Sequence, residues 1–253
     1  DTLLTTSPTF GYYSPCAQMQ GMAIEAIPYH LPDFAFPLEE IRAALGQGPR
    51  LLLICNPNNP TGTRLAPERI LEFAATAAQT LVVVDELYEA FTGDSVLPVA
   101  DFAATPNLLV LRSLAKTAGL AGLRIGFAIG AAAVIDRISR VVGPYDINSF
   151  AVTAALAALA DQPYVDGYVA EVRRARDWLV QQLRGAGVRH HAGGGNYLLI
   201  WPERPAEQVE QRLRQQGILV RSMADKPLIA GSLRVSIGTL EQMGQFWAAY
   251  AAI

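Results

Sequence analysis

Hydrophobic residues in the first half of the chain occur in short unbroken runs that end on turn-forming residues. These runs are LLLICN from Leu51, LVVVDE from Leu81, NLLVLRS from Asn107 and LRIGFAIG from Leu123. Such runs are typical of strands buried on both faces. Amphipathic stretches over residues 37–46 and about 66–79 predict helices between them. Alternating strands and helices predict a mainly parallel sheet with helices on both faces, which is an α/β fold.

After about Pro144 the pattern of apolar and polar positions changes. Two long stretches, 149–160 and 164–185, predict helices, and charges gather on one face of the second. Short strand-like runs follow (VRHH, NYLLIW, GILVR and LRVSIG), with predicted helices over 205–216 and from about Leu240 to the end. This pattern predicts a smaller α+β domain. We therefore divide the chain into a large domain, residues 1–145, and an interdomain helix with a small C-terminal domain, residues 146–253.

The first residues, DTLLTTSPTFGYY, begin directly on a strand-like run with no helix before it. A sheet that starts this way lacks its early elements. We therefore expect the large domain to be incomplete at its N-terminus.

Composition excludes several classes of protein. Hydrophobic residues make up 51% of the 253 residues and charged residues 17%, which is typical of a globular chain. A net charge of −3 argues against a nucleic-acid binder, and no apolar run is long enough to predict a membrane span. The N-terminus lacks a secretory pattern, and two cysteines, Cys16 and Cys55, favour a reducing compartment. We therefore expect a cytoplasmic protein.

Lysine is scarce in this sequence. Of its 20 basic residues only Lys116 and Lys226 are lysines, so 18 are arginines. Because arginine stays protonated and is a poor amine nucleophile, any chemistry that needs a neutral amine has two candidates.

Polar residues follow the predicted buried strands in a fixed order. They are Asn59 in CNPNNPTG, Asp85 and Tyr88 in VVVDELY, Lys116 in RSLAKTAGLAGLR, and Arg124 at the end of that segment. Ligands of open α/β sheets bind at the carboxyl ends of the strands. Singly, each residue has an ordinary interpretation as a cap, loop or surface residue. Their joint order favours a binding site.

The residue types suit a cofactor that transfers amines. Small and apolar neighbours favour the neutral form of the Lys116 amine, as an imine with an aldehyde requires. Asp85, at the end of a run of valines, is placed to pair with a protonated pyridine nitrogen. Tyr88 and Asn59 have the chemistry to bind a ring oxygen. Two possible hydrogen-bond donors for a phosphate lie near Lys116: Ser113, three residues before it, and Arg124, eight residues after it.

Four segments, NPNNPTG, VVVDELY, SLAKTAGLAGLRIG and LRVSIGT, resemble the fold-type I aminotransferases that depend on pyridoxal 5'-phosphate (PLP). Within that family the chain is most similar to the histidinol-phosphate aminotransferases. The resemblance runs through essentially the whole chain and includes PTFGYY, GPYDINSFA and GNYLLI.

The resemblance implies a role for each matching residue. Lys116 is implied as the catalytic Schiff-base lysine, and Asp85 as the partner of the pyridine nitrogen. Cofactor contacts are further implied for Tyr88 and Asn59 at the ring 3-oxygen, Ser113 and Arg124 at the phosphate, and Phe10 stacked on the ring. The matching positions for the substrate are Asn59, Asn196, Arg221 and Arg234, the two arginines as a clamp for its anionic end.

Two features depart from the family pattern. Ala115 stands where the family usually has a serine before the lysine, and a lost hydrogen bond to a charged group costs about 1.5–3 kcal/mol. The family also has several dozen residues before PTFGYY, with a glycine-containing phosphate loop and a tyrosine lent to the neighbouring subunit. We expect the sequence to be the ordered part of a longer chain.

The implied function is transfer of an amino group from an amino acid, usually glutamate, to an oxo-substrate with an anionic tail. Imidazole acetol phosphate of histidine biosynthesis is the implied acceptor, and a homodimer with shared active sites is the implied assembly. Three alternatives stay open: an aromatic amino acid aminotransferase, a threonine-phosphate decarboxylase, and a non-catalytic PLP-fold module. Retention of Lys116, Asp85, Tyr88 and Arg124 argues against the last.

Overall fold

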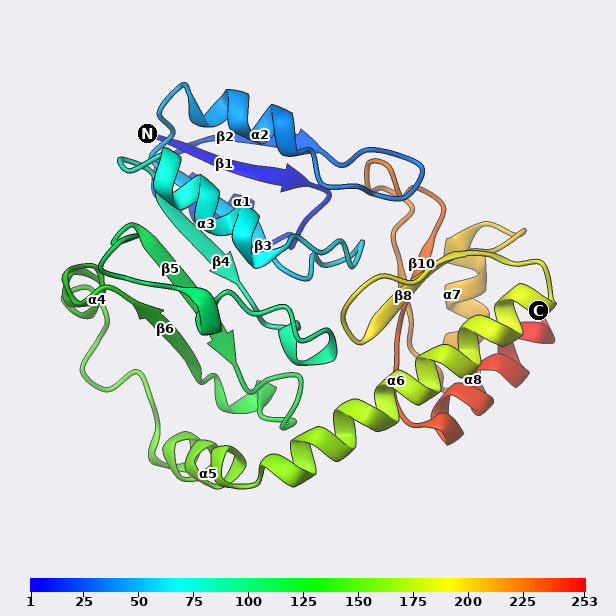
Figure 1. The fold of residues 1–253 in the computed structure, drawn as a ribbon. Helices are drawn as coiled ribbons and strands as arrows, with labels where there is room; N and C mark the ends of the chain where they lie inside the picture. Colours follow the sequence, from blue (N-terminus) through cyan, green and yellow to red (C-terminus); the bar gives the residue numbers. More distant parts are fainter.

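The computed structural model describes all residues, 1–253, and contains two β-sheets that are linked through helices α5 and α6 (Figure 1). The strands are β1 Thr2–Ser7, β2 Ala23–Pro28, β3 Leu51–Cys55, β4 Leu81–Asp85, β5 Leu108–Ser113, β6 Gly126–Gly130, β7 Arg189–His191, β8 Tyr197–Trp201, β9 Arg221–Ser222 and β10 Leu233–Ser236. The helices are α1 Tyr13–Met19, α2 Leu38–Leu45, α3 Pro67–Thr76, α4 Ala132–Ser139, α5 Ser149–Ala160, α6 Gln162–Gly185, α7 Ala206–Gln215 and α8 Leu240–Ala251.

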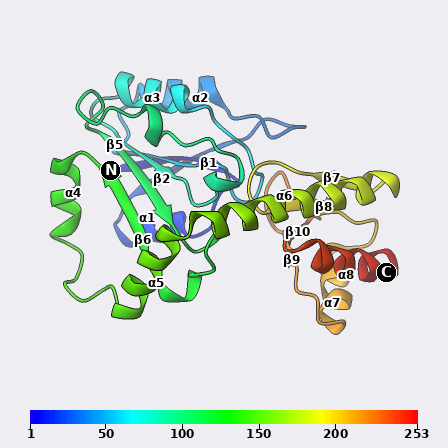
Figure 2. The same ribbon diagram turned by 60° about the horizontal axis from the view of Figure 1, so that its bottom comes forward.

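The larger sheet has the order β2-β1-β3-β4-β5-β6 and is parallel except for β6. Figure 2 shows α2 and α3 on one face of this sheet and α1 on the other. The buried strand residues Ile54, Val84 and Val110 pack with Ile70 and Phe73 of α3. This arrangement confirms the predicted fold class of a mainly parallel sheet with helices on both faces.

Strand β6 runs antiparallel to β5, and its first residue Gly126 pairs with the last residue of β5, Ser113. The segment between the two strands therefore begins and ends at the carboxyl edge of the sheet. This segment carries Lys116 and Arg124, so both residues are brought to the edge where the parallel strands end.

The smaller sheet, β7-β8-β10-β9, is antiparallel and packs against α6, α7 and α8. Its core includes Leu179 and Leu183 of α6, Ile200 of β8 and Leu213 of α7, all fully buried. Helix α8 begins with a capping box in which the Thr239 and Gln242 side chains each bond the other's backbone. This part confirms the predicted smaller α+β unit, while the boundary at residues 145 and 146 stays a prediction.

Most predicted elements are confirmed, but the GILVR strand is wrong over most of its length. Only Arg221–Ser222 pairs with β10, although β10 itself has four residues. Three elements escaped the apolar pattern, namely α1, β2 and α4. Helix α4 buries none of its residues, and β2 is an edge strand that is mostly exposed. The apolar run of β2 is also interrupted by Glu25. None of the helices combines the length and the apolar character that a membrane span requires.

The loops after β1 and β3 diverge at the carboxyl edge of the larger sheet. Helix α1, which follows β1, lies on one face, and α3, which follows β3, lies on the other (Figure 2). Where neighbouring strands send their connections to opposite faces, a crevice opens outside the strand ends, and ligands bind there in open α/β folds. The fold thus places the candidate site between these two loops.

Truncation of the core under α3 tests the packing of the larger sheet. Phe73 is fully buried, so we expect Phe73→Ala to lower the free energy of unfolding by about 3–5 kcal/mol. Met19→Ala, at a side chain with 68% exposure, is the control and should change it by less than about 0.5 kcal/mol. Urea unfolding followed by circular dichroism measures both, and equal effects would contradict this core.

Candidate functional site

A pocket of about 340 Å³ lies at the carboxyl edge of the larger sheet, where the smaller sheet meets it. The larger sheet contributes the loop that follows β1 and Asn59 and Pro60 from the loop that follows β3. The smaller sheet contributes Arg221, Arg234, Met223 and Lys226. The pocket therefore opens at the crevice that the diverging loops predict.

Buried amides hold the loop after β3 in place. The Asn58 Nδ2 atom donates to the carbonyl of Pro8 at 2.9 Å, and Thr9 Oγ1 donates to Asn58 Oδ1 at 2.7 Å. Asn56 exchanges two hydrogen bonds with the backbone of Leu65, at 2.9 and 3.0 Å. Because buried polar groups are costly unless satisfied, these bonds fix the loop conformation and hence the position of Asn59.

Asp85 is the last residue of β4 and is held by two hydrogen bonds. Tyr13 Oη donates to Oδ2 at 2.7 Å, and the Leu87 backbone N–H donates to Oδ1 at 3.1 Å. Burial raises the pKa of the Asp85 carboxyl group above its usual range, and these two bonds only partly oppose that effect. Burial also raises the pKa of Tyr13 far above that of an exposed phenol, so Tyr13 remains a donor. Asp85 is thus a desolvated acid with no ion-pair partner in the chain.

Lys116 follows β5 and is partly buried. Its Nζ atom lies 5.8 Å from the centre of the Tyr88 ring. Burial lowers the pKa of the Lys116 amine, and the positive charge of Arg234 lowers it further. Both effects increase the fraction of neutral amine, which is the nucleophilic form.

Arg234, Asn59 and Tyr88 form a chain of hydrogen bonds between the two sheets. Arg234 Nη1 donates to Asn59 Oδ1 at 2.7 Å, and Asn59 Nδ2 donates to Tyr88 Oη over a long 3.4 Å. Burial raises the pKa of Tyr88 to about 12, against the opposing effect of Arg234. The Nε atom of Arg234 is buried and has no hydrogen-bond partner.

Arg221 and Arg234 are direct partners in the antiparallel pairing of β9 with β10, and both line the pocket. Directly opposed residues project on the same face of a sheet, so the two guanidinium groups are neighbours. The structure thus brings together the two predicted substrate arginines. Phe10 also lines the pocket, with its ring edge-on to Tyr13 at 5.4 Å and 41% of the residue exposed.

Six predicted site residues do not line this pocket: Asp85, Tyr88, Lys116, Ser113, Arg124 and Asn196. The last three make contacts within the protein instead. Ser113 Oγ donates to the carbonyl of Ile125 at 3.2 Å and accepts from the Ala115 N–H at 3.1 Å. Arg124 is exposed, has a left-handed backbone (φ 57°) and donates to the carbonyl of Ala121 at 3.3 Å. Asn196 accepts a bond from the Ile237 N–H through its backbone carbonyl at 2.7 Å. Their predicted contacts with cofactor and substrate stay predictions.

Several residues of this site were not predicted, among them Tyr13 and Lys226. Tyr13 lies in the first turn of α1 and donates to Asp85, which is 72 positions further along the chain, so the sequence pattern does not reveal this contact. Lys226 lines the pocket from the loop between β9 and β10. The scarcity of lysine was a signal for Lys226, but no motif placed it.

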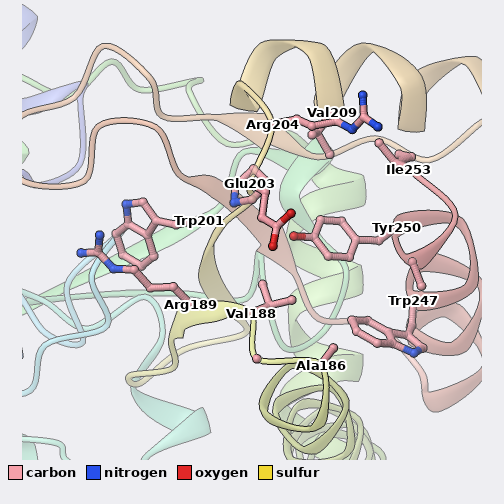
Figure 3. Close-up of a pocket in the computed structure, with 13 residues that line it drawn as sticks. Ala186, Val188, Arg189, Trp201, Glu203, Arg204, Val209, Trp247, Tyr250 and Ile253 are labelled. Atoms are coloured by element: carbon pink, nitrogen blue, oxygen red, sulfur yellow. The ribbon is translucent and has the colours of Figure 1, made fainter.

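A larger cavity of about 490 Å³ lies in the smaller sheet, beside α8 (Figure 3). Arg189 stacks on Trp201 at 4.3 Å, and Figure 3 shows Glu203 pointing toward Tyr250. None of the predicted site residues lines this cavity, and it holds no lysine. The smaller cavity at the sheet edge is therefore the candidate functional site.

Known proteins match the chain in sequence and in structure. The sequence matches the family described as Aminotransferase class I and II over residues 1–249. A histidinol-phosphate aminotransferase of Desulfitobacterium hafniense is 35% identical over 246 residues, which cover 93% of this chain and 66% of that protein. The chain thus spans just under two thirds of the length of this curated relative.

Solved structures show the same fold. A histidinol-phosphate aminotransferase of Sinorhizobium meliloti in complex with pyridoxal-5'-phosphate superposes with a TM-score of 0.87 at 25% identity, covering 99% of this chain and 69% of that one. An L-threonine-O-3-phosphate decarboxylase of Porphyromonas gingivalis has a TM-score of 0.85 at 24% identity, covering 99% and 76%. The second likeness shows the fold alone.

The bond between Tyr13 and Asp85 is open to a direct test. Because the phenol lowers the pKa of the buried carboxyl group, we expect Tyr13→Phe to raise that pKa further. At pH 7 the variant loses a bond to a charged group and about 1.5–3 kcal/mol of unfolding free energy. The native carboxyl group titrates above its unfolded value, so the loss shrinks as the pH falls and Asp85 protonates.

Urea unfolding at several pH values measures this difference. Tyr12→Phe is the matched control, since Tyr12 is 59% exposed and its hydroxyl has no hydrogen-bond partner in the structure. A Tyr13→Phe deficit that is the same at pH 4 and pH 7 would contradict the link to Asp85.

Proposed function

Because the chain belongs to the aminotransferase class I and II family, we propose that it is a PLP-dependent aminotransferase of the histidinol-phosphate type. One observation carries the proposal. A partly buried lysine with a lowered amine pKa and a buried, ion-pair-free carboxylate both follow neighbouring parallel strands at one edge of the sheet. A ligand that binds an amine through one end and an acid through the other needs such a pair of groups.

The donors and acceptors of the site fit PLP. Asp85 has a desolvated carboxylate suited to a pyridinium nitrogen, and Asn59 and Tyr88 have an amide and a phenol suited to the ring oxygen. We assign the phosphate contacts to Ser113 and Arg124 and the ring-stacking contact to Phe10. When bound, PLP supplies an aldehyde that takes up the amino group and a ring that accepts electrons.

The residues of the chain then have distinct tasks. Lys116 Nζ would hold the aldehyde of PLP and, when freed by a substrate, would move the proton at the substrate Cα. Its lowered pKa keeps enough of the amine neutral for both tasks. Asp85 keeps the pyridine nitrogen protonated, since a desolvated carboxylate gains most from a nearby cation.

The substrate arginines set the acceptor class. We assign Arg221, Arg234, Asn59 and Asn196 to the substrate, with the arginines on its anionic tail. The unpaired Nε atom of Arg234 supports that assignment. Glutamate is the proposed amino donor, and imidazole acetol phosphate the proposed acceptor, which places the reaction in histidine biosynthesis. The name of the relative at 35% identity supports this choice.

Because the chain has two lysines, the anchor can be tested with a matched pair of variants. We expect borohydride reduction of the PLP-loaded protein to attach PLP to Lys116, and Lys116→Ala to abolish both the attachment and the visible absorbance that shifts with glutamate. Transamination should fall by about 10²–10⁴-fold or more. Peptide mass spectrometry and a coupled glutamate assay measure these outcomes.

Lys226→Ala is the control and should keep PLP attached at Lys116. Attachment at Lys226 in the unchanged protein would contradict the proposal. Carbon dioxide release from threonine phosphate, without amino transfer, would instead establish a decarboxylase.

We also propose a homodimer. Large apolar side chains are exposed on α5 and on the segment before it, a surface formed by Val141, Tyr145, Phe150, Leu156 and Leu159. Phe150 is 82% exposed and Tyr145 91%, and large exposed apolar side chains gathered on one segment favour a protein interface. A second copy of the protein is the proposed partner.

A charge placed in that surface should separate the two copies. We expect Phe150→Asp to raise the dimer dissociation constant by about tenfold or more, since an apolar interface loses affinity when a charge must be desolvated. Analytical ultracentrifugation measures it. Leu219→Asp, at an exposed residue before β9, is the control and should leave the dimer intact. A monomeric parent protein would contradict the proposal.

A further inference from the structure

The candidate pocket is cationic in a protein whose net charge is negative. Its lining includes three basic side chains, Arg221, Lys226 and Arg234, and no acidic one. The whole chain has a net charge of −3. Three positive charges around one pocket repel one another unless an anion binds between them. The lining of the pocket therefore suits an anionic ligand.

The loop between β9 and β10 holds Lys226 at the pocket. Met223, at the start of the loop, and Ile229 are buried among Tyr29, Phe34 and Leu199. The Met223 N–H donates to the carbonyl of Ser232 at 2.8 Å, which closes the base of the loop.

A turn within this loop sets the position of the lysine itself. The Lys226 N–H donates to the carbonyl of Met223 at 3.1 Å. The backbone of Lys226 is thus fixed, and only its flexible side chain has to adjust to a ligand.

Arg234 and Lys226 differ in the hydrogen bonds and ion pairs that they already make within the protein. Arg234 donates through Nη1 to Asn59, and its Nε atom is buried and unpaired. Lys226 has a single ion pair, 3.3 Å from the adjacent Asp225, whose side chain is 77% exposed. An exposed pair of this kind is worth little, so the Lys226 amine is free to exchange Asp225 for a ligand.

We propose that Lys226 determines specificity for a doubly charged tail, namely a phosphate monoester, over a carboxylate. Two arginines more than balance a carboxylate, which has one charge and two oxygens. A phosphate monoester has nearly two charges and three terminal oxygens at neutral pH, so it has an oxygen and a charge left for a third cation. The inference rests on the proposed aminotransferase function and adds the residue that selects the tail.

The test compares three amino donors that share an imidazole ring and differ in the tail: histidinol phosphate, histidine and histidinol. With the PLP-loaded full chain and 2-oxoglutarate, we expect Lys226→Met to raise KM for histidinol phosphate about three- to tenfold. KM for histidine and histidinol should change by less than about twofold, because neither tail needs the third cation. Inorganic phosphate should also inhibit the variant more weakly, by a similar factor.

Two further variants separate charge from folding. Lys226→Arg should keep the preference for the phosphate tail, and Arg212→Ala, on the exposed surface of α7, removes the same charge without touching the pocket. A Lys226→Met effect equal for all three donors, or equal to that of Arg212→Ala, would overturn the inference. A parent protein that transfers amino groups but does not prefer histidinol phosphate would also overturn it. Absence of any amino transfer would instead refute the proposed function.

Discussion

A buried carboxylate without a cation of its own is the constraint around which this site is organised. Asp85 is bonded to the Tyr13 phenol and the Leu87 backbone N–H, and burial still raises its pKa. Desolvating a charged group is costly, and the chain offsets that cost only in part. A positively charged ring nitrogen would offset the rest of this desolvation cost. A cofactor that carries such a nitrogen would therefore bind more tightly next to Asp85.

The neighbouring acid shows the contrast. Glu86 is fully buried, whereas Asp85 is partly buried, and Glu86 pairs with Arg112 and accepts bonds from Ser95 and from the Val96 N–H. Successive residues at a strand end point to opposite faces, so the two acids belong to different environments. Glu86 is satisfied within the protein and is structural, whereas Asp85 remains available to a ligand.

The site also depends on the meeting of two sheets. Arg234 of the smaller sheet bonds Asn59 of the larger one and lowers the pKa of Lys116. The pKa of the Lys116 amine is therefore lowered in part by a residue of the other sheet. Any change in how the sheets pack would alter the pKa of Lys116. An anion next to Arg234 would alter it too, because it would offset the positive charge of the guanidinium group.

The sequence by itself determined the order of the strands in the chain, the α/β class and the positions of Asn59, Asp85, Tyr88 and Lys116 after strands. Buried strands need unbroken apolar runs, which can be recognised in short segments of sequence. A parallel sheet then gathers the loops that follow its strands at one edge, so the position of a residue after a strand is enough to place it there. Only the tertiary structure decided that Tyr13 reaches Asp85 and that Lys226 joins the arginines. It also decided that GILVR pairs over two residues alone. Those features depend on contacts between distant segments, and neither periodicity nor spacing encodes which segments pack together.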